Sequence, residues 1–197
     1  MKRIGVFGGT FNQPHIAHSI IAEDIMEQFT LDKIIFIPSG VPPLKDESVI
    51  ISANHRLNMA RIAFGKNSNF EVSDIEINNS QGKSYTVDTL LRLKESYKKD
   101  EVKLYLIIGI DNLIDFPKWK NPEKLFLLSE VIVVNRPFYT VQEAKPEYSS
   151  KVTFAKVPSL EISSVVIRGL VKNNKSIRYL VHPEVEKYIF ENKLYLS

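Results

Sequence analysis

The sequence predicts an α/β fold, a doubly wound, Rossmann-like parallel sheet with a short helical C-terminal part. Three observations support this prediction. Short apolar segments alternate with helical patterns along the chain. Most of these segments are apolar at nearly every position, as expected of strands that helices cover on both faces. Two of them, residues 3–9 and 103–109, end in glycine, at the edge where such sheets bind their ligands.

Six segments have the length and composition of strands. Most are continuous apolar runs, and one of them is stopped by Pro38, whereas residues 70–77 alternate between apolar and polar positions. In chain order, the predicted strands are residues 3–9, 33–38, 70–77, 103–109, 131–134 and 151–157.

Helical patterns separate and follow these strands. In the first of them, Pro14 suits the first helical position, and one face carries Ala17, Ile20, Ile21 and Ile25. A loop that contains proline and charged residues, 39–50, precedes the second helix. In chain order, the predicted helices are residues 14–29, 53–65, 84–97, 122–130, 162–174 and 183–192.

Length and composition favour a single domain over residues 1–197, with a helical C-terminal part from about residue 160. The chain has no cysteine, which excludes disulfides and fits a reducing compartment. With no signal-peptide core and no membrane-length apolar stretch, we expect a cytoplasmic protein without a membrane partner. The net charge of +3, from 26 basic and 23 acidic residues, is too small to favour a nucleic-acid partner. Composition leaves open whether the chain forms a homo-oligomer.

The stretch GGTFNQPHIAH joins the first predicted strand to the first helix. Gly8 and Gly9 would let the backbone turn tightly and approach a ligand closely. A helix N-terminus offers free N–H groups and a positive dipole end, and His15 and His18 add imidazole donors on its first turn. We interpret this unit as a phosphate site. Ordinary capping or surface histidines and a zinc pair are alternatives, whereas the stretch matches neither a Walker A loop nor G-x-G-x-x-G.

Two further segments carry candidate polar groups. Gly109 and Asp111 end a buried strand, where a carboxylate can accept a hydrogen bond from a ribose hydroxyl or cap the next helix. Ser163 and Ser164 precede a helix as N-cap candidates, and Arg168, one turn later, offers a planar fork to phosphate oxygens. The alternative for this second segment is an ordinary capped helix with a solvated arginine.

The motifs together resemble one family. GGTFNQPHIAH resembles the nucleotidyltransferase signature, and its longer pattern is similar to that of the bacterial nicotinate-nucleotide adenylyltransferases. The resemblance covers nearly the whole chain through FIPSGVPPLK, HRLNMARIA, SYTVDTL, IIGIDNL, PKWK and ISSVVIR, in that order. The chain departs from the family pattern at Gln13 in place of proline, Leu44 in place of histidine and Val165 in place of threonine.

The resemblance implies transfer of the adenylyl group of ATP to nicotinate mononucleotide, which gives deamido-NAD and pyrophosphate in NAD biosynthesis. The mononucleotide phosphate would attack the α-phosphorus in line, with catalysis by positioning and electrostatics. Mg²⁺ would be held by the phosphates, without dedicated protein ligands. We expect ATP to contact Gly8, Gly9, Thr10, Phe11, His15, His18, Gly109, Asp111, Ser163, Ser164 and Arg168, of which His15, His18 and Arg168 are catalytic.

For nicotinate mononucleotide we expect contacts with Lys45, Tyr85, Thr86 and Trp119. Trp119 would stack on the pyridine ring, and free backbone N–H groups near Thr86 would hold the carboxylate. Thr86 as a plain N-cap and Lys45 as a solvated loop residue are the alternatives. Other functions consistent with the fold are pantetheine-phosphate adenylyltransferase, a cytidylyltransferase, or a non-catalytic nucleotide-binding protein. SYTVDTL, PKWK and ISSVVIR favour the nicotinate enzyme, and His18 and Arg168 favour catalysis.

Overall fold

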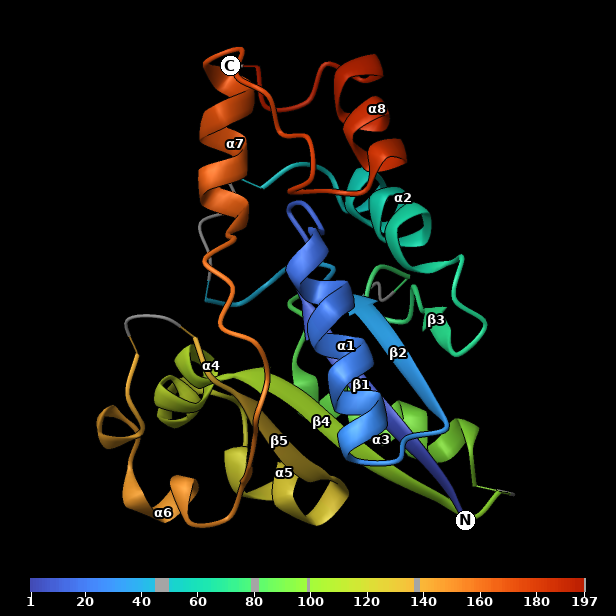
Figure 1. Ribbon diagram of the computed structural model, residues 1–197. Helices are drawn as coiled ribbons and strands as arrows, with labels where there is room; N and C mark the ends of the chain where they lie inside the picture. Colours follow the sequence, from blue (N-terminus) through green and yellow to red (C-terminus); the bar gives the residue numbers. More distant parts are fainter. Residues whose placement is uncertain (45–49, 79–81, 99, 137–138, 197) are drawn as a thin grey trace.

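Parallel strands form the centre of the molecule, as predicted (Figure 1). The computed structural model describes residues 1–44, 50–78, 82–98, 100–136 and 139–196. Within these ranges six strands form one sheet in the order β3-β2-β1-β4-β5-β6, and all neighbouring pairs are parallel. The strands are β1 (Lys2–Gly9), β2 (Lys33–Pro38), β3 (Phe70–Val72), β4 (Val102–Gly109), β5 (Glu130–Val134) and β6 (Thr153–Ala155).

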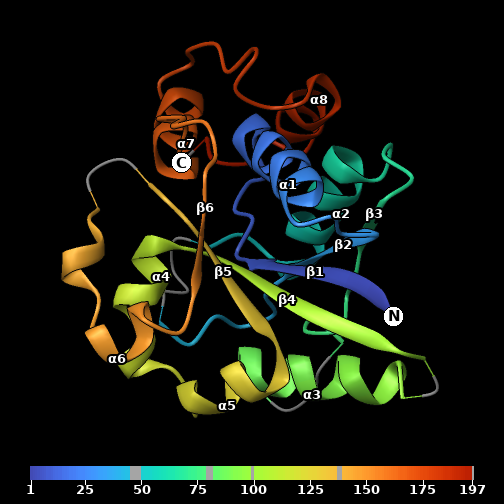
Figure 2. The same cartoon turned by 60° about the horizontal axis from the view of Figure 1, so that its bottom comes forward.

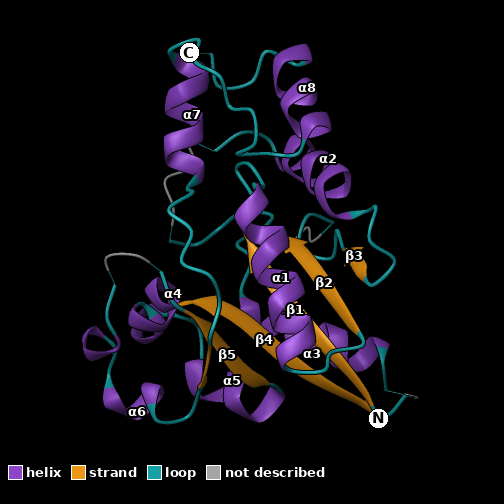
Figure 3. Ribbon diagram, in the orientation of Figure 1, coloured by secondary structure: helices purple, strands orange, loops and turns teal. Residues whose placement is uncertain are grey.

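Helices cover both faces of the sheet. Figure 2 shows α1, α2, α7 and α8 above the strands and α3 and α5 below them, and Figure 3 shows the same layers as purple helices around orange strands. Among the described residues, no helix is long and apolar enough to cross a membrane. The helices are α1 (Ile16–Gln28), α2 (Ala53–Phe64), α3 (Thr86–Ser96), α4 (Ile110–Ile114), α5 (Pro122–Leu128), α6 (Pro146–Ser149), α7 (Ser164–Lys172) and α8 (Pro183–Glu191), with 3-10 turns at Phe116–Lys118 and Val141–Glu143.

Side chains of each central strand alternate between two cores, one on either side of the sheet. In β2, Ile34 and Phe36 pack with residues of α1, α2, α7 and α8, while Ile35 and Ile37 pack with residues of α3 and α5. All four are essentially buried. Because both faces are covered, an uninterrupted apolar run is what such a strand requires, which is why the sequence signal is clear here.

The first helix begins two residues later than predicted. Pro14 precedes it, and His15 is its N-cap, with extended backbone angles of φ −141° and ψ 167°. The prediction that Pro14 takes the first helical position is therefore wrong, because the chain leaves the preceding loop in an extended conformation. Ala17 and Ile25 are buried as predicted, whereas Ile20 is 38% exposed and lines a groove on the outer side of α1.

The third strand is shorter than predicted, Phe70–Val72 instead of 70–77. After it, the side chain of Ser73 accepts a hydrogen bond from the N–H of Ile75 at 3.3 Å, and a hydrogen-bonded turn at Asp74 follows. Local side-chain bonds of this kind compete with a strand ladder. The alternating pattern thus belongs partly to a turn at the edge of the sheet.

The strand order places two strand ends side by side. β1 and β4 are direct neighbours, with Phe7 opposite Ile107, so the chain leaves the sheet at Gly9 and Gly109 along the same edge. From β1 the chain continues to β2 on one side, and from β4 it continues to β5 on the other. This is the switch point at which such sheets bind their ligands.

Arg56 in α2 joins the loops at this edge of the sheet. Its side chain is 1% exposed. The guanidinium donates to four backbone carbonyls, from Nε to Ile51 (3.1 Å), from Nη1 to Thr10 (2.9 Å) and Ser39 (2.5 Å), and from Nη2 to Gly40 (2.8 Å). A buried cation is tolerated when its N–H groups are satisfied in this way. The loops after β1 and β2 and the segment before α2 are thereby tied to one side chain.

Replacing Arg56 by alanine should destabilise the fold, because the carbonyls that it serves would lose their donor. We expect a loss of about 3–5 kcal/mol in the free energy of unfolding, measured by urea denaturation. Arg56→Lys should recover only part of it, since an ammonium group lacks the planar fork. The matched control is Arg61→Ala in the same helix, whose exposed ion pair with Asp74 is worth less than about 1 kcal/mol. Equal losses for the two alanine variants would contradict this account.

Candidate active site

The loop after β1 turns at Phe11 and not at the glycines. Gly8 and Gly9 are still part of β1, and the left-handed backbone of the turn belongs to Phe11 (φ 45°). The expectation that the glycines form the turn is therefore wrong. A Cβ added to Gly8 would meet no atom within 4 Å, whereas one on Gly9 would lie 3.2 Å from the ring of Phe11. Gly8 thus leaves room for a ligand, and the buried ring of Phe11 covers Gly9.

His15 and His18 form a stacked pair at the N-terminus of α1. Their ring centroids are 3.7 Å apart with an interplanar angle of 28°. The backbone N–H of His15 donates to Nδ1 of His18 at 3.1 Å, and the N–H of His18 donates to the carbonyl of His15 at 2.9 Å. Since Nδ1 of His18 accepts a hydrogen bond, the hydrogen-bond network assigns its ring proton to Nε2, which becomes a donor. The backbone therefore fixes the tautomer that a phosphate ligand needs.

Burial keeps His15 neutral. It is 8% exposed, and loss of solvation lowers the pKa of its imidazole to about 4, with a smaller contribution from the positive charge of Arg136. At neutral pH the ring can therefore donate one hydrogen bond without carrying a charge. The zinc alternative gains no support, because no three His, Asp or Glu side chains cluster as metal ligands within the described ranges.

The start of α7 is bonded to the loop after β1. Ser163 is the N-cap of α7, as predicted, and its hydroxyl accepts from the N–H of Val166 at 3.3 Å. Ser164 Oγ donates to the carbonyl of Gln13 at 2.8 Å, and Arg168 Nη1 donates to the carbonyl of Asn12 at 2.5 Å. The alternative of a merely solvated arginine is therefore wrong. These bonds bring Arg168 beside the loop that leads into the histidine pair.

At the end of β4, Asp111 faces Arg136. Asp111 Oδ2 lies 3.1 Å from Nη1 of Arg136, while Oδ1 is buried without a hydrogen-bond partner among the described residues. Asp111 does not cap α4, whose N-cap is Gly109, so the capping alternative is wrong. A Cβ on Gly109 would lie 2.3 Å from Asp111 Oδ1 and 2.8 Å from Nε of Arg136. Glycine at this position leaves room for both side chains.

Arg136 was missed in the sequence analysis. It lies two residues beyond the end of β5, the strand next to β4, and its charge acts on both Asp111 and His15. A basic residue directly after a buried strand, at the edge where ligands bind, is the signal that could have identified it. With Arg168 it supplies positive charge at the edge that carries the histidine pair.

Two of the residues expected to bind the mononucleotide lie at the start of α3. Tyr85 is the N-cap of α3 and Thr86 its first residue, so the alternative that Thr86 is the N-cap is wrong. Lys120 connects Trp119 to this helix, because its Nζ lies 4.8 Å from the ring centroid of Tyr85 and 2.8 Å from Oδ2 of Asp88. The link through Lys120 was missed, since it joins segments distant in sequence.

Of the other two residues expected to bind the mononucleotide, the structure describes Trp119 but not Lys45. Trp119 is half-buried, with its ring 4.9 Å from that of Phe116, so part of its surface belongs to the core. Lys45 lies outside the described residues. Of the departures from the family pattern, Leu44 and Val165 are exposed, and Gln13 is fully buried.

Among the described residues, buried polar atoms without hydrogen-bond partners concentrate at the same edge. Besides Tyr105 in the body of β4, they are found on Gln13, His15, Ser39 and Asp111, in the segments that follow β1, β2 and β4. Such atoms mark where a ligand or water completes the hydrogen bonding. They support a polar ligand at the switch point.

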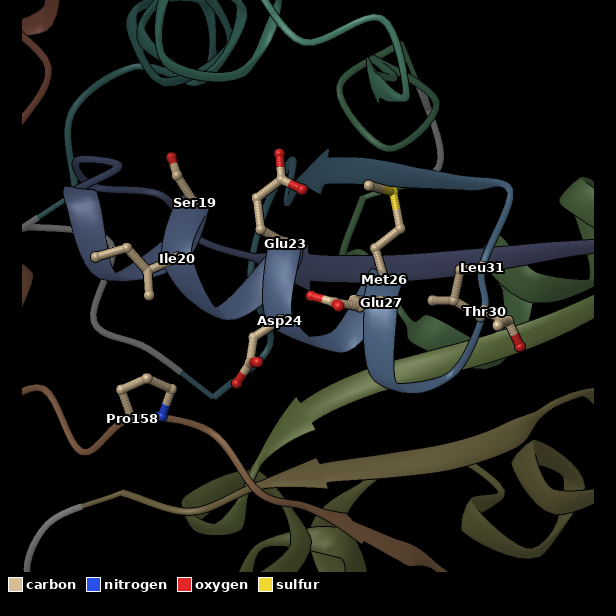
Figure 4. Close-up of a pocket in the computed structure, with 9 residues that line it drawn as sticks. All are labelled: Ser19, Ile20, Glu23, Asp24, Met26, Glu27, Thr30, Leu31 and Pro158. Atoms are coloured by element: carbon tan, nitrogen blue, oxygen red, sulfur yellow. The ribbon is translucent and has the colours of Figure 1, made fainter.

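An open groove elsewhere on the surface is a poor candidate. It runs along the outer side of α1 and is lined in part by Glu23, Asp24 and Glu27 (Figure 4). These carboxylates would repel a polyphosphate. The histidine pair, Asp111 and Arg168 do not line it.

Comparisons with known proteins agree with the geometry. The cytidylyltransferase-like family model matches residues 6–169, a range that includes the histidine pair and Arg168. The nicotinate-nucleotide adenylyltransferase of Bacillus subtilis is 39% identical over 197 residues, covering all of both chains. A protein of Desulfitobacterium hafniense, described as a probable nicotinate-nucleotide adenylyltransferase, is 41% identical over 98% of this chain and 96% of its own.

Solved structures share the fold. A nicotinic acid mononucleotide adenylyltransferase of Plasmodium falciparum, complexed with NaAD, superposes with a TM-score of 0.82, covering 99% of this chain and 98% of that chain at 23% identity. The same enzyme complexed with APC gives a TM-score of 0.79 at 22% identity.

The low pKa of His15 can be measured by NMR. In the folded, ligand-free protein its Cε1 proton signal should stay constant from pH 8 to about pH 5.5 and move only as the pH approaches about 4. The control is the same residue in urea, which should titrate near 6.5. Between about pH 6.5 and pH 4 the unfolded chain binds a proton at His15 that the folded chain does not. The free energy of unfolding should therefore fall as the pH drops through this range, and it should fall less in His15→Gln. A midpoint near 6.5 in the folded protein would contradict the assignment.

Proposed function

The chain belongs to the cytidylyltransferase-like family and, within it, to the nicotinate-nucleotide adenylyltransferases, and on this premise we propose how its residues perform the reaction. The enzyme transfers the adenylyl group of ATP to nicotinate mononucleotide in NAD biosynthesis, and the products are deamido-NAD and pyrophosphate. The observation that carries the proposal is the stacked histidine pair, with its tautomer fixed, at the N-terminus of α1.

The ATP phosphates bind between α1 and α7. His18 donates from Nε2 to an α-phosphate oxygen, and the neutral ring of His15 donates beside it. Arg168 uses Nη1 to hold Asn12, and its other N–H groups contact the β- and γ-phosphates. Binding of these anions should raise the pKa of His15, which desolvation keeps low in the free enzyme. Arg136 adds positive charge on the β5 side of the site.

The chemical step is a direct displacement. An oxygen of the mononucleotide 5′-phosphate forms a bond to the α-phosphorus, and the bond between that phosphorus and the oxygen that bridges to the β-phosphate breaks. Pyrophosphate leaves with the electron pair. Negative charge spreads over the α-phosphate oxygens, so a donor held at those atoms stabilises the transition state, and no protein nucleophile takes part.

The adenosine ribose is placed at the end of β4. Asp111 Oδ1 is a buried acceptor without a partner among the described residues, while Oδ2 is held by Arg136. A ribose hydroxyl would supply the missing donor. The absence of a side chain at Gly109 leaves room for this carboxylate.

We propose that Mg²⁺ binds with ATP. The groups that surround the proposed phosphate position are imidazole, guanidinium and hydroxyl donors, and the nearby carboxylate of Asp111 is paired with Arg136. This donor set fits a cation held chiefly by phosphate oxygens and water. When bound, Mg²⁺ supplies positive charge that offsets the charge of the triphosphate.

Nicotinate mononucleotide binds at the start of α3. The first-turn N–H groups at Thr86 and Val87 have no intrahelical acceptor and suit a carboxylate. Trp119 offers its face to the pyridine ring. Lys120, over the ring of Tyr85, holds the two segments together. The proposed contact of Lys45 stays a proposal from the sequence.

The role of His18 can be tested by truncation. His18→Ala should lower kcat by roughly 10²–10³-fold, the effect of losing one transition-state donor, when pyrophosphate release is measured with saturating ATP, Mg²⁺ and nicotinate mononucleotide. Ser19→Ala is the matched control, because Ser19 follows His18 in α1 but bonds to His182 at 3.0 Å. Turnover like that of the wild type in folded His18→Ala would refute the role.

Acceptor choice tests the proposed mononucleotide site. Backbone N–H groups favour a carboxylate and offer no acceptor to the NH₂ of an amide, so kcat/KM for nicotinate mononucleotide should exceed that for nicotinamide mononucleotide by up to roughly 10⁴-fold. The assay compares pyrophosphate release with each mononucleotide and with 4′-phosphopantetheine. Equal values for the two mononucleotides would refute the carboxylate argument. Release with phosphopantetheine alone would overturn the assignment of the acceptor.

A further inference from the structure

The described residues after α8 pack against the fold. Beyond α8, Leu194 is 8% exposed and belongs to the core that α1, α7 and α8 share, and its N–H donates to the carbonyl of Ile189 at 2.9 Å. Lys193 and Tyr195, on either side of it, have left-handed backbones (φ 54° and 63°). The C-terminal end lies beside α7 in both views of the ribbon (Figures 1 and 2). The tail thus follows a defined path.

This path brings the hydroxyl of Tyr195 to the loop after β1. It donates to Oδ1 of Asn12 at 3.0 Å, across 183 positions of the sequence. Asn12 is 5% exposed, so water competes little for the contact. Burial raises the pKa of Tyr195, which keeps the hydroxyl protonated and a donor at any working pH.

Asn12 is where several segments meet. Its Oδ1 also accepts from the N–H of Ile51, at 3.4 Å, and its carbonyl accepts from Nη1 of Arg168. The C-terminal tail, the segment before α2 and helix α7 therefore all donate to this one residue. It precedes His15 by three positions in the loop that leads into the histidine pair.

We propose that Tyr195 is a positioning residue for adenylyl transfer. It acts through Asn12 and keeps His15, His18 and Arg168 in the positions from which they contact the ATP phosphates. The inference rests on the function proposed above. A reaction without a protein nucleophile depends on donors fixed before the substrate arrives, and small displacements of such donors are costly. The hydroxyl of Tyr195 bonds to Asn12 and contributes by restricting the loop.

Tyr188 provides a matched control. It lies in α8, and its hydroxyl, like that of Tyr195, links the C-terminal part to the rest of the fold. The hydroxyl lies 2.9 Å from Nδ1 of His55 and 3.1 Å from Nδ2 of Asn58, both in α2. Tyr188→Phe and Tyr195→Phe each remove one oxygen and leave the ring. The two substitutions should lower the free energy of unfolding by similar amounts. Only Tyr195→Phe removes a hydrogen bond to the loop after β1, at Asn12.

The first measurement is steady-state kinetics, at a temperature well below both melting points. Tyr195→Phe should lower kcat/KM for ATP by up to about tenfold, the scale of one hydrogen bond, and leave KM for nicotinate mononucleotide unchanged. Tyr188→Phe should match the wild type in both. Wild-type ATP kinetics in Tyr195→Phe, or an equal rise in KM for both substrates, would overturn the proposal.

The second measurement does not depend on activity. The chain has four histidines, so their Cε1 proton signals can be assigned from single His→Gln variants. Tyr195→Phe should shift the signals of His15 and His18, whereas Tyr188→Phe should shift that of His55. If the His15 and His18 signals keep their positions in Tyr195→Phe, the proposal is wrong. Inactive wild type would refute the proposed function instead, which separates the two failures.

Discussion

The hydrogen bonds of Arg56 to four backbone carbonyls are the constraint on which the site depends. They tie Thr10, Ser39 and Gly40 to one buried guanidinium. From Gly40 the connection continues, because its N–H donates to Oγ of Ser84 at 3.0 Å, immediately before the N-cap of α3. A Cβ at Gly40 would lie 2.4 Å from the carbonyl oxygen of Glu76, so the approach is possible for glycine alone. One buried side chain thus joins the loop proposed to bind the ATP phosphates to the start of the proposed acceptor site.

Electrostatics in the site favour a neutral imidazole at His15, near the positive charge of Arg136. Two protonated rings stacked at 3.7 Å would repel each other and Arg136, and desolvation already lowers the pKa of His15. Neutral rings still donate hydrogen bonds, so the site keeps its donors without internal repulsion before ATP binds. Arg168 and Arg136 carry the permanent positive charge. Arg168 is held by the carbonyl of Asn12, and Arg136 is held by the carboxylate of Asp111.

The sequence predicted a parallel sheet, most of its strands, a shared edge for the ends of β1 and β4, and the N-cap at Ser163, because apolar runs and serine caps are local signals. It misjudged features that depend on neighbours. The turn lies at Phe11, whose ring fills the core, and the edge strand stops where Ser73 bonds locally. Arg136 and Lys120 were missed, since their partners are distant in sequence. Local patterns thus located the histidine pair and Arg168, while the contacts that orient them required the three-dimensional structure.

The two cores separate the proposed phosphate donors from the proposed acceptor contacts. His15, His18 and Arg168 stand on α1 and α7, which share one core, whereas Tyr85 and Trp119 stand on segments packed into the core on the opposite face. The sheet therefore lies between these donors and these contacts, while Asp111, the proposed ribose contact, stands on α4 in the second core. Substitutions around Tyr85 and Trp119 can change the proposed acceptor contacts while the proposed phosphate donors on α1 and α7 keep their packing. An architecture of this kind lets one catalytic half persist through evolution while the other half is remodelled for new acceptors.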